Sequence, residues 1–162
     1  MLALELGGGP ALAATFLGLN GIGRMLAAVP SGSAISRFGD KRTMVGGLIV
    51  IGVASLGLVV VETLWLVSLL ALALGAGVGA WMLARLHYVA EHCPVSHRGR
   101  AMTVLAGLHR VGALVGPILG GVVAEYLGYP VLFMVCAGLA VGGIVLVMRF
   151  TRRTPPEQGR PR

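Results

Sequence analysis

Five apolar runs, each long enough to cross a bilayer, limit what this chain can fold into. A helix needs about 20 apolar residues to span the hydrocarbon core. Because lipid offers the backbone no hydrogen-bonding partner, a run of that length must be helical there. We therefore expect an all-α polytopic membrane protein whose residues 1–150 form one transmembrane bundle. The predicted spans cover residues 10–36, 43–61, 64–90, 99–124 and 131–148.

The composition is that of a membrane protein. Of the 162 residues, 56% are hydrophobic and only 12% are charged, whereas globular proteins carry about 25% charged residues. The net charge of +7 does not indicate nucleic-acid binding, because the basic residues lie at the ends of apolar runs without interleaved aromatic side chains. Neither a Gly-x-Ser-x-Gly nor a His-Glu-x-x-His motif is present. We therefore expect no enzymatic activity, no cofactor and no metal site.

Charges alternate between the connections of the predicted spans. The acids Glu62 and Glu125 lie in two connections, and basic residues mark the remaining connections and the C-terminal end: Arg37, Lys41, Arg42, Arg98, Arg100 and five arginines within residues 149–162. By the positive-inside rule the basic side is cytoplasmic, which predicts a multi-pass protein of the plasma (inner) membrane with a cytoplasmic C-terminus. Residues 151–162 are basic and contain prolines, which predicts a disordered tail that lies on anionic headgroups.

A ladder of small residues occupies the fourth predicted span, where Gly112, Gly116, Gly120 and Gly121 surround Pro117. In water this would be a poor helix, because each interior Gly costs about 1 kcal/mol against Ala and Pro about 3 kcal/mol. In a bilayer, small residues spaced by four let a neighbouring helix approach closely. The proline removes one helical hydrogen bond and produces a bend or a notch. The ladder is therefore predicted to be a helix-packing motif.

This Gly-x-x-x-Gly-Pro-x-x-Gly-Gly spacing resembles the motif in the fifth span of antiporters of the major facilitator superfamily (MFS). Gly75, Gly77 and Gly79 also fit the fourth span of that family, although Ala71 stands where the family often carries an arginine. The family's loop between its second and third spans has the form Gly-x-x-x-Asp-Arg-x-Gly-Arg-Arg. Ser36 here replaces its acid, Asp40 replaces a base, and the matching positions are Gly32, Arg37, Gly39 and Lys41.

The resemblance implies a partial N-terminal bundle, in which the five spans are the second to sixth of twelve and Met1–Gly9 is the outer end of a first span. It implies a secondary active transporter that moves small molecules by alternating access, as an efflux system or antiporter, with protons as a candidate coupling ion. A full transporter encloses its cavity between two halves, so we expect a second transporter half or a homo-oligomer. The rival interpretation is a truncated non-transporting remnant or a membrane assembly subunit. Residues 32–42, including Arg42, form the expected cytoplasmic gate loop.

Arg24 lies near the middle of the first predicted span, with Asn20 one turn earlier on the same face. An unpaired charge at that depth costs several kcal/mol, so Arg24 needs a partner or water. Two interpretations remain open. Arg24 and Asn20 form a cavity wall that contacts an anionic or hydrogen-bonding substrate, or Arg24 makes a structural interhelical contact or extends to the interface.

His109 and Arg110 lie in the fourth predicted span on faces that differ by about 100°. His109 shares the face of the glycine ladder, which favours an interhelical hydrogen bond, with a proton relay as the alternative. Arg110 faces either the substrate cavity or the cytoplasmic headgroups. The chain has no carboxylate at mid-membrane. Proton coupling would therefore depend on His109 or on an acid from a partner.

Overall fold

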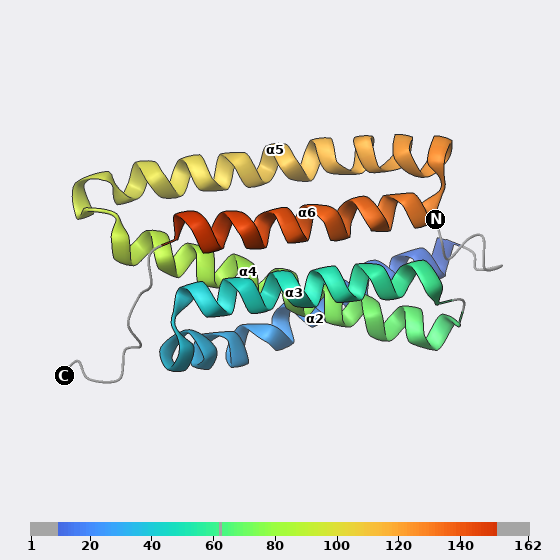
Figure 1. Cartoon of the computed structure of the whole chain (residues 1–162), viewed down its shortest axis with the longest axis horizontal. Helices are drawn as coiled ribbons and strands as arrows, with labels where there is room; N and C mark the ends of the chain where they lie inside the picture. Colours follow the sequence, from blue (N-terminus) through green and yellow to red (C-terminus); the bar gives the residue numbers. More distant parts are fainter. Residues whose placement is uncertain (1–9, 62, 152–162) are drawn as a thin grey trace.

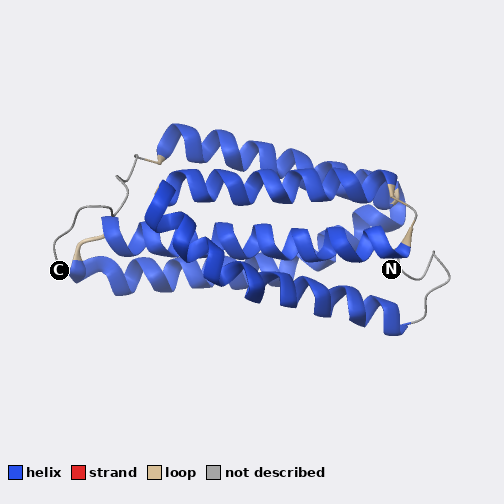
Figure 2. Cartoon of the chain, turned by 90° about the horizontal axis from the view of Figure 1, so that it is seen from below, coloured by secondary structure: helices blue, strands red, loops and turns tan. Residues whose placement is uncertain are grey.

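The computed structural model describes residues 10–61 and 63–151, which form five helices without any strand (Figures 1 and 2). The all-α fold class is thus confirmed. The helix boundaries lie within about four residues of the predicted spans, and the predicted first-span remnant and residues 152–162 of the tail fall outside the described residues. The helices are α2 (Pro10–Phe38), α3 (Asp40–Val60), α4 (Leu64–His92), α5 (Val95–Leu127) and α6 (Tyr129–Phe150).

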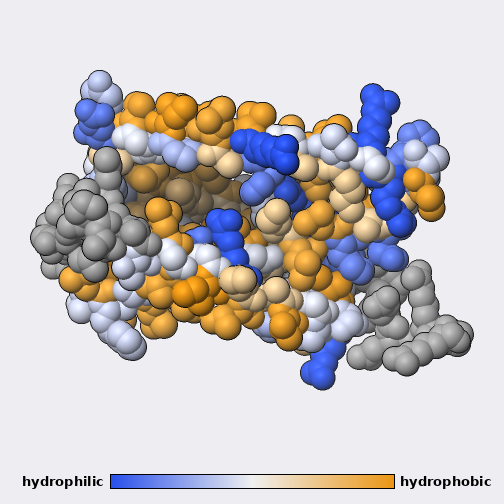
Figure 3. Space-filling view, turned by 180° about the vertical axis from the view of Figure 1, so that it is seen from behind, coloured by the Kyte–Doolittle hydropathy of each residue, from blue (hydrophilic) through white to orange (hydrophobic). Residues whose placement is uncertain are grey.

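Four of the described helices, α3 to α6, are long and apolar enough to cross a membrane. The helix α2 has 29 residues, as many as α4, and its place among the spans remains a prediction. Large apolar side chains cover much of the surface, as Val29, Val60 and Leu139 illustrate with exposed fractions above 70%. Figure 3 shows this apolar surface, with hydrophilic groups at the ends and also partway along the bundle. Such a surface suits contact with lipid rather than with water.

The centre of the bundle is α4, which packs against α2 and α3, while α3 also packs against α6. Glycines permit the close approach. A Cβ at Gly75 would collide with the backbone carbonyl of Asn20, and one at Gly23 with that of Leu72. Between α3 and α4, a Cβ at Gly47 would lie 2.8 Å from the carbonyl oxygen of Gly77. Backbones at this separation gain dispersion energy along the whole contact, which is how helices associate in lipid.

The helix α5 is attached much more loosely. It contacts mainly α6 and makes only a few contacts with α4, and none of its residues is buried. Figure 1 shows α5 along one edge of the bundle. Its long side chains, such as Leu108 and Leu114, are about 70% exposed. One side of α5 is therefore open among the described residues.

The turn between α2 and α3 is a single residue, Gly39, with φ 81°. This left-handed conformation strains any side-chain-bearing residue, so glycine is required. Gly128, with φ 84°, makes the equivalent turn between α5 and α6 at the opposite end. The turn at Gly39 brings the end of α2 and the start of α3 to the end of the bundle where α4 and α6 finish and α5 begins (Figure 1).

Candidate substrate cavity and cytoplasmic gate

A short polar chain connects α2 and α4 near the middle of α2. The Nε–H of Arg24 donates to Oδ1 of Asn20 over 3.1 Å. The amide of Asn20 in turn donates to the backbone carbonyl of Ala71 over 3.5 Å, the long limit for such a bond. Asn20 is thus held from both sides, and the exposed side chain of Arg24 is oriented through it. An Arg head tethered at one nitrogen keeps its other donors available for a second ligand.

Ala71 is the position where the resemblance to the facilitator motif leads us to expect an arginine. It is completely buried, and α2 covers it through Asn20. The guanidinium of Arg24 lies one amide group away from this position, on the neighbouring helix. The chain therefore has a cation close to the expected place, but it comes from α2 rather than from α4.

His109 is half-buried and Arg110 is exposed on α5. The structure does not bring either residue to Arg24 or Asn20 through any hydrogen bond or ion pair between described residues. The glycine ladder is also open: among residues 10–61 and 63–151, no atom of another helix lies within 4 Å of a Cβ built at Gly112, Gly116 or Gly121, and Gly120 meets only Leu132 at 3.7 Å. No described helix therefore packs closely on Gly112, Gly116 or Gly121.

At the end of the bundle, Asp40 begins α3 and is 1% exposed. The Nδ1–H of His87, on α4, donates to Oδ1 of Asp40 over 2.7 Å. The side chain of His87 is 37% exposed. The first turn of a helix favours a negative charge, because its N–H groups carry partial positive charge. The second oxygen, Oδ2, is buried without a partner among the described residues. Asp40 thus connects α3 to α4.

Lys41 connects the same turn to α6. Its Nζ donates to the carbonyl oxygens of Met148 at 2.7 Å and Thr151 at 2.8 Å. The last carbonyls of a helix have no partner within it, and the helix dipole favours a cation there. Ser36 donates to the carbonyl of Ser33 at 2.9 Å within α2. At this turn, the carboxylate that joins α3 to α4 is therefore that of Asp40, the first residue of α3.

The remaining gate-loop residues point outward or make no cross-helix contact. Arg37 and Arg42 are exposed, and a Cβ at Gly32 would meet no atom within 4 Å.

Sequence reasoning missed His87, the partner of Asp40. The signal that would have found it is a titratable residue near the end of the third predicted span, residues 64–90, at the same predicted depth as the loop acid. In the described part of the chain, no cluster of three or more His, Cys, Asp or Glu residues could hold a metal ion.

Comparison with known proteins gives a consistent result. The sequence model described as Major Facilitator Superfamily matches residues 1–162. The methyl viologen resistance protein SmvA of Salmonella typhimurium is 31% identical over 132 residues, which cover 80% of this chain and 26% of SmvA. The multidrug resistance protein MdtG of Salmonella paratyphi B is 24% identical over 82% of this chain and 33% of its own length. The riboflavin transporter RibZ of Clostridioides difficile is 24% identical over 46% of this chain and 16% of RibZ.

The matched stretches cover between about a sixth and a third of the length of these relatives, with shares of 16%, 26% and 33%. The family model covers residues 1–162, so its match includes both the polar chain of Arg24 and the predicted gate loop. The apolar helices and this match make the chain a multi-pass membrane protein.

Proposed function

Because the chain belongs to the major facilitator superfamily, we propose that it forms part of a secondary active transporter that exports small molecules by alternating access. We place it in the plasma (inner) membrane with the α2–α3 turn and the C-terminus in the cytoplasm, following the positive-inside rule. SmvA and MdtG are named as resistance proteins, which supports an efflux role here.

The observation that carries this proposal is the exposed guanidinium of Arg24, halfway along α2 and oriented by Asn20. A cation at membrane depth is costly unless it faces a cavity or a partner. Its anchor to Asn20 is a neutral amide, so the positive charge of Arg24 is not neutralised within the described residues. We propose that it contacts an anionic or hydrogen-bonding group of the substrate. Arg110, exposed on α5, is the second proposed cavity residue.

The glycine ladder of α5 supports the need for a further transmembrane partner. Its open face, with Gly112 and Gly116 meeting no atom within 4 Å, has the small-residue character of a helix interface. We propose that a helix of a second transporter half, or of a second copy of this chain, packs there and limits leakage. His109 lies beside this face and is the proposed hydrogen-bonding or proton-relay residue. Protons as the coupling ion remain part of this proposal.

The test begins with the native polypeptide, tagged at the C-terminus at its own locus and analysed under denaturing conditions and after crosslinking. Transport is then measured in cells whose native gene carries Arg24→Ala or Arg24→Lys. We use a panel of one anionic dye, riboflavin and methyl viologen, because riboflavin and methyl viologen occur in the names of RibZ and SmvA. For the anionic dye and for riboflavin, loss of one charged hydrogen bond, about 1.5–3 kcal/mol, predicts roughly a tenfold or greater loss of affinity in Arg24→Ala. Methyl viologen is a dication that cannot accept a hydrogen bond from Arg24, so its transport should not fall in Arg24→Ala. Arg24→Lys should keep part of the activity.

A matched control is Arg98→Ala, which removes an exposed arginine at the start of α5. It should leave transport unchanged, because Arg98 is not among the proposed cavity residues. Deletion of the gene without any change in the accumulation of the panel would support the rival interpretation of a non-transporting remnant or assembly subunit. A native species at the 16.7 kDa of this chain that crosslinks to no partner would support the same interpretation.

A further inference from the structure

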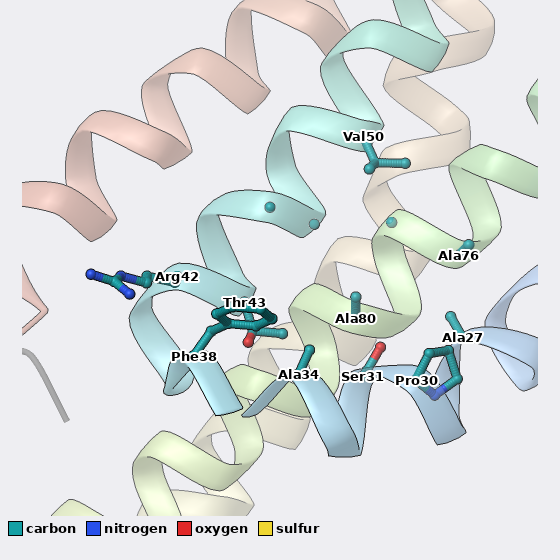
Figure 4. A pocket seen from close by; sticks show the side chains of 13 residues that line it. Ala27, Pro30, Ser31, Ala34, Phe38, Arg42, Thr43, Val50, Ala76 and Ala80 are labelled. Atoms are coloured by element: carbon teal, nitrogen blue, oxygen red, sulfur yellow. The ribbon is translucent and has the colours of Figure 1, made fainter. Parts of the chain in front are cut away.

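A groove of about 430 Å³ lies between α2 and α3, with α4 as its floor. Figure 4 shows Phe38 and Arg42 at one end of this groove and Val50 and Ala76 at the other. Small side chains account for its width: Ala34 from α2, Gly46 from α3 and Ala80 from α4 are among its lining residues. It is separate from the polar chain of Arg24, which does not line it.

The walls of the groove are apolar except at its outer end. Of the polar lining residues, Ser31 is 5% exposed, and the hydroxyl of Thr43 donates to the carbonyl of Gly39 over 3.0 Å. Neither presents a charge. From Arg42 to Val50 the helix rises by about 12 Å at 1.5 Å per residue. This is close to half of the roughly 30 Å hydrocarbon thickness, so the groove is about as long as one leaflet is deep.

Arg42 is the charged residue of the lining, and its side chain is exposed. Its neighbour Lys41 is occupied by the end of α6, whereas Arg42 has no hydrogen bond or ion pair with any residue in 10–61 or 63–151. Figure 4 shows its guanidinium extending away from the floor of the groove. A cation at the membrane surface next to an apolar groove of leaflet depth complements an anionic headgroup joined to an acyl chain.

We propose that this groove binds an anionic phospholipid, with one acyl chain between α2 and α3 and the phosphate on Arg42. The bound lipid fills the space left between these two helices, which make few contacts with each other and are held together mainly through α4. The proposal requires membrane insertion but no transport activity, so the two can fail independently.

The test uses the purified full chain in phosphatidylcholine vesicles that contain a trace of phosphatidylglycerol with a photoactivatable diazirine on its acyl chain. A parallel sample carries the same diazirine on phosphatidylcholine. After irradiation, the labelled residues are identified by mass spectrometry. We expect the phosphatidylglycerol probe to label residues 27–50 of α2 and α3, where the groove lies.

Two pairs of variants separate the chain from the headgroup. Gly46→Leu fills the groove, and Gly138→Leu adds the same side chain to α6; a Cβ at either position meets no atom within 4 Å. We expect Gly46→Leu to lose groove labelling by both probes and Gly138→Leu to retain it. Arg42→Gln should lower labelling by phosphatidylglycerol about fivefold, since one basic residue near an anionic surface contributes about 1 kcal/mol. Arg98→Gln removes an exposed arginine outside the groove and should not change labelling by the phosphatidylglycerol probe.

Equal labelling in Gly46→Leu and Gly138→Leu would overturn the acyl-chain site. An unchanged preference for phosphatidylglycerol in Arg42→Gln would overturn the headgroup assignment. If the groove residues crosslink to another polypeptide and exclude both lipid probes, the occupant is a helix and the proposal is wrong. If inorganic phosphate alone competes fully with the phosphatidylglycerol probe, the site binds a free anion rather than a lipid.

Discussion

The contact between Asp40 and His87 makes a sharp prediction about stability. Asp40 is 1% exposed and accepts one charge-assisted hydrogen bond of 2.7 Å from His87. Replacing His87 with Leu leaves both carboxylate oxygens without a partner, because Oδ2 already has none in the described part of the chain. Orphaning a buried acceptor costs about 1–3 kcal/mol, and more for a charged group. The 37% exposure of His87 lets water reach the site, so we expect a loss of about 2 kcal/mol.

Removing both partners should cost less than removing His87 alone, because two apolar residues leave no orphaned group. We expect Asp40→Leu/His87→Leu to be about 1 kcal/mol less destabilised than His87→Leu, with the lost N-terminal charge of α3 contributing the remaining cost. The measurement is equilibrium unfolding in mixed detergent micelles, followed by tryptophan fluorescence in a Trp65→Phe background. Trp81, the remaining tryptophan, packs against the buried cluster of Ile35, Met44 and Ala84. Additive effects of Asp40→Leu and His87→Leu in the double-mutant cycle would refute the reasoning.

Three further outcomes are expected. Lys41→Met should remove the cap of α6 and accelerate hydrogen exchange in its last turn by about fivefold or more, from roughly 1 kcal/mol of lost dipole and hydrogen-bond energy. The control Arg37→Met, which removes an exposed arginine of α2, should leave exchange in α6 unchanged. Gly75→Ala should destabilise the bundle in the micelle assay by more than 1 kcal/mol, because its Cβ collides with the carbonyl of Asn20. Gly116→Ala, in open space, should leave the stability of this chain unchanged or raise it by up to about 1 kcal/mol, yet reduce transport if a second half packs there.

The helical architecture was predictable because it follows from one-dimensional information. A run of about 20 apolar residues has few alternatives in lipid, and each predicted run overlaps one observed helix. The contacts between helices were less accessible. The pairs Asp40–His87 and Lys41–Met148 are separated by 47 and 107 residues, and the sequence does not tell which face of α4 meets the start of α3. Only packing in three dimensions sets that register.

For the glycines, too, the sequence predicts the local feature but not the contact. Their spacing predicts helix faces of small residues that suit close packing, and such packing is predicted for the ladder on α5. Within the described residues, the close backbone contacts occur instead at Gly23, Gly47, Gly75 and Gly77 on α2, α3 and α4. A small face shows that a neighbour can approach but not which neighbour is present. The ladder therefore stays a predicted interface whose partner lies outside residues 10–61 and 63–151.

The three consecutive charged residues after Gly39 differ in their contacts, and this difference affects which helices can move. Asp40 holds α4 and Lys41 holds α6, while Arg42 is left exposed beside the groove. A displacement of α3 relative to α4 or α6 would have to break charge-assisted bonds of about 1.5–3 kcal/mol each. The helices α3, α4 and α6 are therefore expected to move as one body, whereas α5, with no buried residue, has the fewest contacts to break. In alternating access, we expect rearrangement at the face of α5 rather than within the α3, α4 and α6 group.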